Sequence, residues 1–163
     1  MNGSITVRRA APPDGPAFLD LVRALAVFEK LPPPTDAACG RLLRDAFGDP
    51  PRFELWVAEL PAEDTDAGRV VAYAVTFMTY STFLARPTLY LEDIFVHPHA
   101  RRRGVARTMM AHLLDLARRR GCGRCEWVVL DWNHGAKELY RDIGAELHTD
   151  WQLNRVTIER PEN

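Results

Sequence analysis

Two adjacent carboxylic acids are candidates for chemistry because they interrupt an otherwise apolar segment. Glu92 and Asp93 lie within residues 89–96, among Leu, Ile, Phe and Val. A carboxylate inside a sheet is costly unless it is paired or its pKa shifts. A strand that keeps two such residues either pairs them or needs them for a function. We therefore expect a functional role for Glu92 and a hydrogen-bonded structural role for Asp93. Because neighbouring strand residues alternate in direction, only one of them is expected to face a given pocket.

A basic loop follows this segment and opens a predicted helix. It reads His97-Pro-His-Ala and then Arg101-Arg-Arg103-Gly104-Val-Ala106. The backbone amides at a helix start favour an anion, Gly104 lets the backbone approach it closely, and the arginines add charge-assisted contacts. The loop therefore predicts a pyrophosphate site, with an ordinary turn carrying solvated arginines as the alternative. It has neither the Gly-Lys-Ser/Thr of a P-loop nor the GxGxxG of a dinucleotide fold.

A third candidate group lies near the C-terminus. Asn133 follows Asp131 and Trp132, and it can cap the last predicted helix while its polar groups face a cleft. Tyr140 lies on the inner face of that helix. For Tyr140 a plain core aromatic is the alternative, and periodicity alone favours it.

Hydrophobic periodicity and chain breakers predict the elements that position these residues. Helices are expected over residues 15–29 after an Asp14 side-chain cap, over 36–47 after a Thr35 cap, over 105–120 before Gly121, and over 133–143. Strands are expected over 5–9, 52–60, 70–80, 89–96 and 125–130, with one bent strand or two over 146–159. This order implies an α/β protein with a mixed sheet and helices on its faces.

The composition is that of one globular domain spanning residues 1–163. Hydrophobic residues make up 47% and charged residues 26% of the 163 residues. No apolar run reaches the roughly 18 residues of a membrane-spanning helix, and the N-terminus has no apolar core of a secretory signal. We therefore expect a cytoplasmic protein without a membrane partner. The net charge of −1 argues against nucleic acid as a partner, although the arginine clusters at 101–103 and 118–120 leave room for a local anion site.

The cysteines predict neither a metal site nor a redox site. Cys122 and Cys125 have CxxC spacing, but no second pair completes a tetrahedral zinc site. We interpret both, together with Cys39, as small apolar residues.

The candidate residues together resemble a family, the GNAT N-acetyltransferases. Arg101-x-x-Gly104-x-Ala106 after a strand is similar to the acyl-CoA-binding motif of that family, and Asn133 with Tyr140 matches a later motif. The resemblance is closer to the diamine and thialysine branch, the spermidine/spermine acetyltransferase relatives. It covers about residues 5–151 and includes Phe28-Glu-Lys-Leu31, Tyr80-Ser-Thr-Phe83, Leu91-Glu-Asp93 and Val129-Leu-Asp-Trp-Asn133. It implies a mostly antiparallel central sheet with helices on both faces, acetyl-CoA as co-substrate, no metal and a homodimer.

The resemblance also implies roles for individual residues. The acetyl-pantetheine arm of acetyl-CoA would contact the strand residues Ile94, Phe95 and Val96. The pyrophosphate would lie on the loop of Arg101, Arg102, Arg103, Gly104, Val105, Ala106 and Arg107. The CoA side would be completed by Asn133, His134, Gly135 and Ala136, with Tyr140 beside the thioester sulfur. The amine site would consist of Phe28, Glu29, Glu92, Glu126, Trp127 and Val128, and the catalytic residues would be Glu92 and Tyr140.

The chemistry of acetyl transfer agrees with these roles. A primary amine with a pKa of about 10 must lose a proton before it attacks a thioester, and Glu92 can accept that proton directly or through water. Tyr140 can serve the departing thiolate. Because a phenol is a weaker acid than a thiol, we expect Tyr140 to donate a hydrogen bond rather than to transfer its proton fully.

The expected function is therefore acetyl transfer to a primary amine of a small molecule, either a diamine or polyamine or a thialysine-like amino acid. Relatives that act on polyamines carry an acid and a Trp where this chain has Ser81 and Phe83, which favours the amino acid. The alternatives are acetylation of a protein N-terminus, a lysine or an aminoglycoside, and a non-catalytic CoA-binding module.

Overall fold

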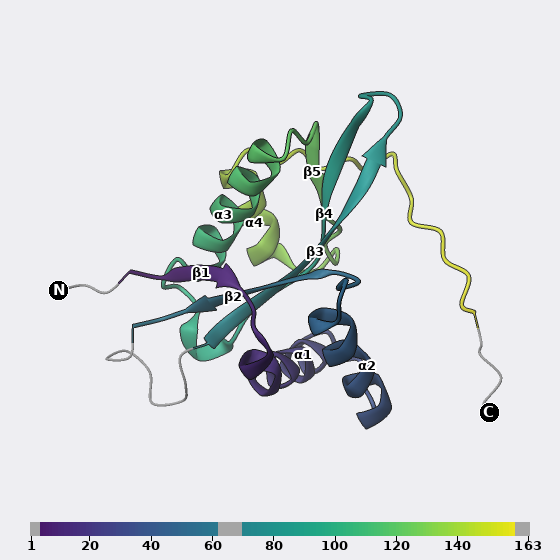
Figure 1. The fold of residues 1–163 in the computed structure, drawn as a ribbon. Helices are drawn as coiled ribbons and strands as arrows, with labels where there is room; N and C mark the ends of the chain where they lie inside the picture. Colours follow the sequence, from purple (N-terminus) through teal and green to yellow (C-terminus); the bar gives the residue numbers. More distant parts are fainter. Residues whose placement is uncertain (1–3, 62–69, 159–163) are drawn as a thin grey trace. The chain divides into compact units, whose positions relative to one another are not determined.

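The computed structural model describes residues 4–61 and 70–158, and the chain forms two compact units, residues 1–128 and 129–163. The first unit contains a five-stranded sheet in the order β1-β2-β3-β4-β5. Its strands are β1 (Thr6–Arg9), β2 (Glu54–Glu59), β3 (Val70–Ser81), β4 (Arg86–Val96) and β5 (Arg124–Glu126) (Figure 1). All neighbours are antiparallel except β4 and β5, which are parallel. This confirms the expected mixed, mostly antiparallel sheet.

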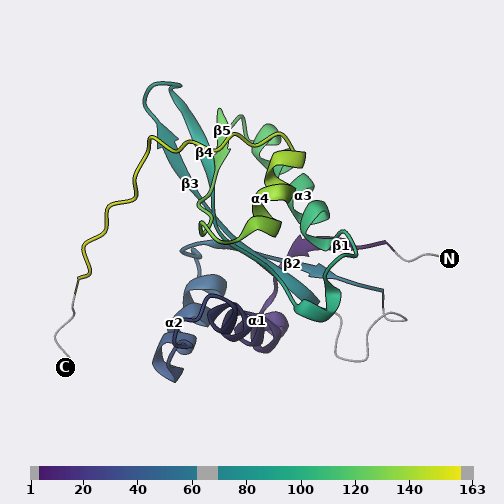
Figure 2. The same ribbon diagram turned by 180° about the vertical axis from the view of Figure 1, so that it is seen from behind.

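The pairing between β4 and β5 is short. It covers only Thr88, Leu89 and Tyr90 of β4, whereas β4 continues to Val96. In the described part of the chain, the edge of β4 beyond Tyr90 therefore has no partner strand, because β5 ends at Glu126. The two strands lie next to each other in Figure 2.

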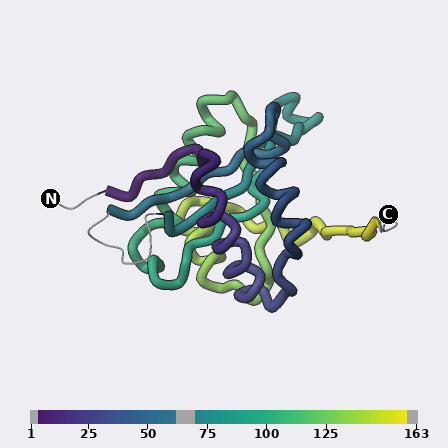
Figure 3. Tube along the Cα trace, turned by 60° about the horizontal axis from the view of Figure 1, so that its bottom comes forward, coloured from purple at the N-terminus to yellow at the C-terminus, as the bar shows by residue number. Residues whose placement is uncertain are grey.

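Helices cover both faces of the sheet, as expected. On one face lie α1 (Gly15–Phe28), which follows the 3₁₀ turn η1 (Pro12–Asp14), and α2 (Asp36–Phe47) (Figures 1 and 3). Phe18 of α1 packs edge-on against Tyr73 of β3, with 5.2 Å between ring centroids. α1 and α2 approach so closely that a Cβ on Gly15 would lie 3.1 Å from the Leu43 side chain. The core on this face also includes Leu21, Ala46, Leu55, Val75 and Phe95.

The opposite face is covered by α3 (Val105–Arg119), which begins after the 3₁₀ turn η3 (Pro98–Ala100). Its Met109, Met110 and Leu113 are fully buried. His112 packs against Trp56 of β2, with 5.0 Å between ring centroids. In the described part of the chain, no helix is both long and apolar enough to cross a membrane.

The second unit contains α4 (His134–Asp142). The strand expected over 146–159 is wrong for its described residues, because 146–158 have no strand, while Glu159 lies outside the described residues. Apolar residues alternate at Trp151 and Leu153 and again at Val156 and Ile158, which suggests a strand, but a strand also needs a paired neighbour. These four side chains are largely exposed. The strand expected over 125–130 is shorter than predicted for the same reason, since only Arg124–Glu126 pairs with β4.

Three predictions about helix ends are confirmed. The Thr35 hydroxyl accepts a hydrogen bond from the Ala38 amide at 3.2 Å, and the Asn133 side chain accepts one from the Ala136 amide at 3.3 Å. Both predicted caps are therefore confirmed. Gly121 follows α3 with a φ of 68°, in the left-handed conformation typical of a helix end.

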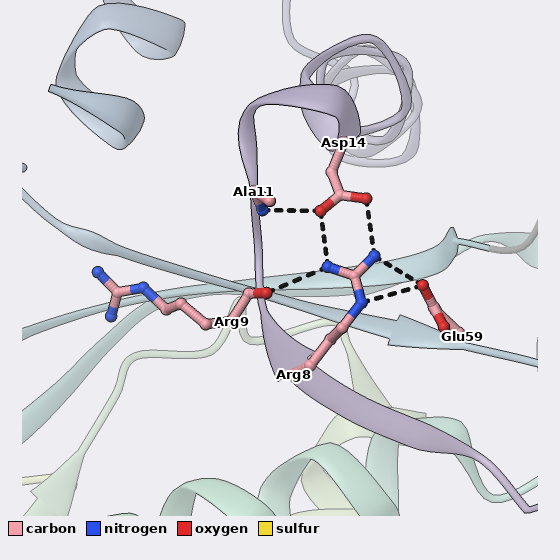
Figure 4. A network of polar contacts seen from close by, with 5 residues as sticks. All are labelled: Arg8, Arg9, Ala11, Asp14 and Glu59. Carbon is pink, nitrogen blue, oxygen red and sulfur yellow. Dashed lines mark hydrogen bonds and ion pairs between the residues drawn. The ribbon is translucent and has the colours of Figure 1, made fainter.

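The predicted side-chain cap by Asp14 is wrong. Its carboxylate accepts hydrogen bonds from both terminal nitrogens of Arg8, at 2.7 and 2.8 Å, and from the Ala11 amide at 2.8 Å (Figure 4). Arg8 also donates to Glu59 of β2, at 2.6 and 3.0 Å. The Arg8 guanidinium thus forms the hydrogen bonds with the Asp14 carboxylate, which therefore does not cap α1. Because Arg8 also bonds to Glu59, it links β1, β2 and the start of α1.

We expect replacement of Asp14 by Asn to destabilise the fold at neutral pH. The hydrogen bonds from Arg8 hold the pKa of Asp14 below its ordinary value. A lowered pKa stabilises the fold above the unfolded-state pKa of about 4, and this stabilisation is lost as the pH falls through the folded-state pKa. Asp14→Asn should therefore lower the free energy of unfolding by about 2 kcal/mol at pH 7 and by less at pH 3, measured by urea denaturation.

Asp20→Asn is the matched control, because Asp20 forms an exposed ion pair with Arg23 one turn away on α1. This change should cost less than about 1 kcal/mol at either pH. Equal effects of the two substitutions at pH 7 would contradict a stabilising role for the Arg8 network.

Candidate active site

A cavity of about 510 Å³ opens in the first unit on the face covered by α1 and α2. Its wall is mostly apolar and comes from α1, α2, the segment before β2, and β3. Three charged residues complete it. The lining residues are Phe18, Val22, Leu42, Phe53, Val75 and Phe77, together with Arg52, Glu92 and Asp93.

Glu92 and Asp93 both line this cavity, so the expectation that only one would face a given pocket is wrong. The reason is a bulge in β4. Val75 of β3 pairs with Asp93, but the next residue, Thr76, pairs with Leu91, which leaves Glu92 as an extra residue. An extra residue interrupts the alternation of side chains along a strand. Two successive carboxylates therefore share one cavity.

Asp93 has a raised pKa. Burial first, and then the negative charges of Glu92 and Glu29, raise its pKa to about 6. The Tyr73 hydroxyl donates a hydrogen bond to Asp93 at 3.3 Å, which opposes part of that rise. Burial strongly raises the pKa of Tyr73 itself, so that its hydroxyl remains a donor. Asp93 thus has the hydrogen bond expected of a structural acid, and it also has a pKa near the range in which a proton acceptor works.

The end of α1 brings Glu29 and Phe28 towards β4. Phe28 and Phe95 lie 6.3 Å apart between ring centroids. The Arg101 guanidinium lies over both rings, 4.9 Å from the centroid of Phe28 and 5.5 Å from that of Phe95. Its Nε donates to the carbonyl of Val96 at 3.2 Å. Arg101 therefore ties the basic loop to α1 and to the end of β4.

The basic loop has the geometry of an anion cradle. Arg102 and Gly104 both adopt left-handed backbone conformations, with φ of 60° and 83°. Gly104 directly precedes α3, and a Cβ built on it would meet no other atom within 4 Å. The space beside this glycine is open, and the first backbone amides of α3 lie at a helix N-terminus, where an anion is favoured. The residues predicted to bind a pyrophosphate lie on this segment: Arg102, Arg103, Gly104, Ala106 and Arg107. Val105, in contrast, is buried in the core.

The remaining predicted amine-site residues lie on or just after β5. Glu126 forms an ion pair with Arg124 at 2.8 Å and pairs across the sheet with Tyr90. Trp127 and Val128 follow it. These three residues are not among those that line the cavity.

The predicted residues of the second unit gather on α4. Asn133 caps the helix, His134, Gly135 and Ala136 form its first turn, and Tyr140 lies one turn further on. Burial raises the pKa of the Tyr140 hydroxyl. Within the described ranges, no group of three or more His, Cys, Asp and Glu side chains is arranged to hold a metal ion.

Comparison with known proteins identifies the class. The chain belongs to the acetyltransferase (GNAT) family, whose model matches residues 18–145. It is 36% identical to a thialysine N-epsilon-acetyltransferase of Sus scrofa over 144 residues, covering 87% of this chain and 84% of that one. It is 28% identical to an L-ornithine N5-acetyltransferase of Arabidopsis thaliana, covering 93% and 83%. A solved probable acetyltransferase shares the fold, with a TM-score of 0.78 over 96% of this chain and 99% of that one at 17% identity.

We expect Asp93 to reduce the stability of the fold, in contrast to Asp14. A carboxyl group whose folded-state pKa is raised favours the fold below its unfolded-state pKa of about 4, and this contribution is lost as the pH rises through about 6. Asp93→Asn should therefore be more stable than the wild type at pH 8, by about 2–3 kcal/mol, and should lose this advantage at pH 4. Urea denaturation at both pH values measures the difference.

Asp14→Asn provides the comparison of opposite sign in the same experiment. Should Asp93→Asn lower stability at pH 8 as Asp14→Asn does, the carboxylate would be a structural group and not a strained one.

Proposed function

We propose that the protein transfers the acetyl group of acetyl-CoA to a primary amine of a small molecule that enters the cavity on the α1 and α2 face. The observation that carries this proposal is the group of carboxylates at β4. Glu92 and Asp93 line a mostly apolar cavity, and the charge of Glu29 acts on Asp93. Such a group attracts an ammonium ion, whose positive charge relieves the repulsion between the acids.

Glu92 and Asp93 would then hold and deprotonate the amine. Glu92 projects from the bulge and is exposed, so that it can accept a proton directly or through water. Asp93 would fix the ammonium with the help of Tyr73. Acetyl-CoA, when bound, supplies the thioester carbonyl that the amine attacks. The backbone amides on the free edge of β4, around residues 94–96, would stabilise the negative charge on the carbonyl oxygen.

The loop at residues 101–107 and the first turn of α4 would bind the CoA portion, as the family resemblance implies. The open space over Gly104 supports this role for the loop. Tyr140 would donate a hydrogen bond to the departing thiolate. Its raised pKa makes full proton transfer to a thiolate still less favourable, which supports hydrogen bonding as its contribution.

The chain offers little to bind the far end of a polyamine near residue 81. Ser81 is buried, and its hydroxyl accepts a hydrogen bond from the Leu84 amide at 3.2 Å. Phe83 is fully exposed. Two of the relatives named above act on thialysine and on ornithine. These observations support an amino acid with a side-chain amine as the substrate.

The homodimer is implied by the resemblance, whereas the location and the absence of nucleic-acid and membrane partners are inferred from the hydropathy and net charge of the sequence. We propose that residues 1–163 act as one acetyltransferase domain, that two copies form a homodimer, and that the protein works in the cytoplasm without nucleic acid or membrane partners.

We expect acetyl-CoA to be consumed with thialysine, ornithine or lysine in preference to spermine. The extra positive charges of spermine meet no additional carboxylate at Ser81, and each missing ion pair costs about 1 kcal/mol. The experiment is a thiol-release assay with acetyl-CoA against these amines, putrescine, spermidine and a glycine-terminated peptide. Thiol release with none of them would overturn the proposed reaction, and a higher kcat/KM for spermine would overturn the substrate preference.

We expect Tyr140→Phe to lower kcat and kcat/KM together by about 100-fold, the lower range for assistance by a proton donor. The charge that the hydroxyl stabilises develops only in the transition state, so the Kd of acetyl-CoA and the Tm should hardly change. Tyr80→Phe is the matched control, because Tyr80 is an exposed tyrosine on β3. A Tyr140→Phe protein that keeps more than about half of the wild-type kcat would make Tyr140 a core residue only.

A further inference from the structure

Arg52 is the one basic residue among the nine that line the cavity. It lies directly before β2, next to Phe53, at a side of the cavity formed by a different strand from Glu92 and Asp93. A guanidinium group presents a planar set of donors that matches a carboxylate. The cavity therefore carries acids on one strand and a cation beside another.

The sheet register shows that Arg52 and the two acids come from opposite sides of β3. Leu55 of β2 pairs with Val75 of β3, and Val75 pairs with Asp93 of β4. Two strand spacings therefore separate β2 from β4, a distance of about 10 Å. The β3 side chains of Val75 and Phe77 form the wall between them. An amino acid with a side-chain amine likewise carries its ammonium and its carboxylate at opposite ends of one chain.

Asp45 holds Arg52 in position from outside the cavity. The Arg52 amide donates to the Asp45 carbonyl at 2.8 Å, and its Nε contacts the Asp45 carboxylate at 3.4 Å. Nε of Arg44 also contacts the same carboxylate, at 3.5 Å. One carboxylate thus faces two guanidinium groups, and this region keeps a positive charge. Because Arg52 contacts Asp45 through Nε, its two terminal nitrogens are placed to bind a second carboxylate.

We propose that Arg52 binds the carboxylate of the substrate and so selects an amino acid with a side-chain primary amine. The side-chain ammonium would lie at Glu92 and Asp93, the carboxylate at Arg52, and the chain between them against Val75 and Phe77. A diamine gains nothing from Arg52, and a polyamine places a second cation near it. This inference rests on the proposed function, because it concerns the amine that the same cavity accepts.

The test compares two amines that differ by one carboxylate. Ornithine and putrescine have the same chain, and putrescine lacks the carboxyl group. We expect Arg52→Gln to lower the ratio of kcat/KM for ornithine to that for putrescine about tenfold, mainly through the KM of ornithine, which is the effect of losing one charge-assisted contact. Arg52→Glu should lower the ratio further, because a carboxylate would then repel the carboxylate of ornithine.

Arg44→Gln is the matched control. Arg44 is exposed and contacts the same Asp45 carboxylate, but it does not line the cavity, so this variant should keep the wild-type ratio. A ratio unchanged in Arg52→Gln, or lowered equally in Arg44→Gln, would overturn the inference. The Tm of each variant verifies that it is folded.

Calorimetric titration with ornithine and putrescine separates the two proposals. It measures the same preference without acetyl transfer. A protein that releases no thiol but binds ornithine more tightly than putrescine through Arg52 would overturn the proposed reaction and leave the carboxylate site standing. If the protein acetylates both amines and Arg52→Gln has no effect, the carboxylate site is overturned and the proposed reaction stands.

Discussion

A strand with one more residue than its partner must turn a side chain out of its alternating pattern, and in β4 that residue is Glu92. Two neighbouring carboxylates consequently line one mostly apolar cavity, and Asp93 is the one partly withdrawn from water. The shift of the Asp93 pKa to about 6 follows from this placement. The rest of the first unit supports an arrangement that is unfavourable by itself. Tyr73 and Phe18 form a tightly packed core beneath the acids, and the Tyr73 hydroxyl donates a hydrogen bond to Asp93.

The positions of the other groups depend on ties between elements that are distant in sequence. Arg8 joins β1 to β2 and to the start of α1, and α1 in turn carries Phe28 and Glu29 at its far end. Arg101 then connects Phe28 to Phe95 and to the end of β4. The basic loop is therefore anchored by one of its own arginines. The contact of Arg101 with aromatic rings means that the arginines of this loop differ in role, although their sequence context is the same.

Features that depend on near neighbours in the chain could be predicted from the sequence. The caps by Thr35 and Asn133, the end of α3 at Gly121 and the alternation of the sheet are of this kind. Features that depend on distant partners could not. The Asp14 side chain is a plausible cap until Arg8 is brought beside it, and residues 146–158 alternate like a strand without being paired. The bulge at Glu92 is set by the register against β3, and Arg52 reaches the cavity only once β2 is in place; neither has a local sequence signal.

Asp14 and Asp93 show how the partners of a carboxyl group set the direction of its pKa shift and its effect on the stability of the fold. Both are carboxylates largely withdrawn from water, and burial alone would raise the pKa of each. Asp14 faces a guanidinium that is part of the fold, so its pKa is lowered and the acid stabilises the protein. Asp93 faces other carboxylates, and its pKa is raised. Among the described residues that line its cavity, the one cation, Arg52, lies in the segment before another strand, β2. An ammonium ion at Asp93 would supply the positive charge that Arg8 gives to Asp14, so amine binding and the stability of the fold are thermodynamically linked.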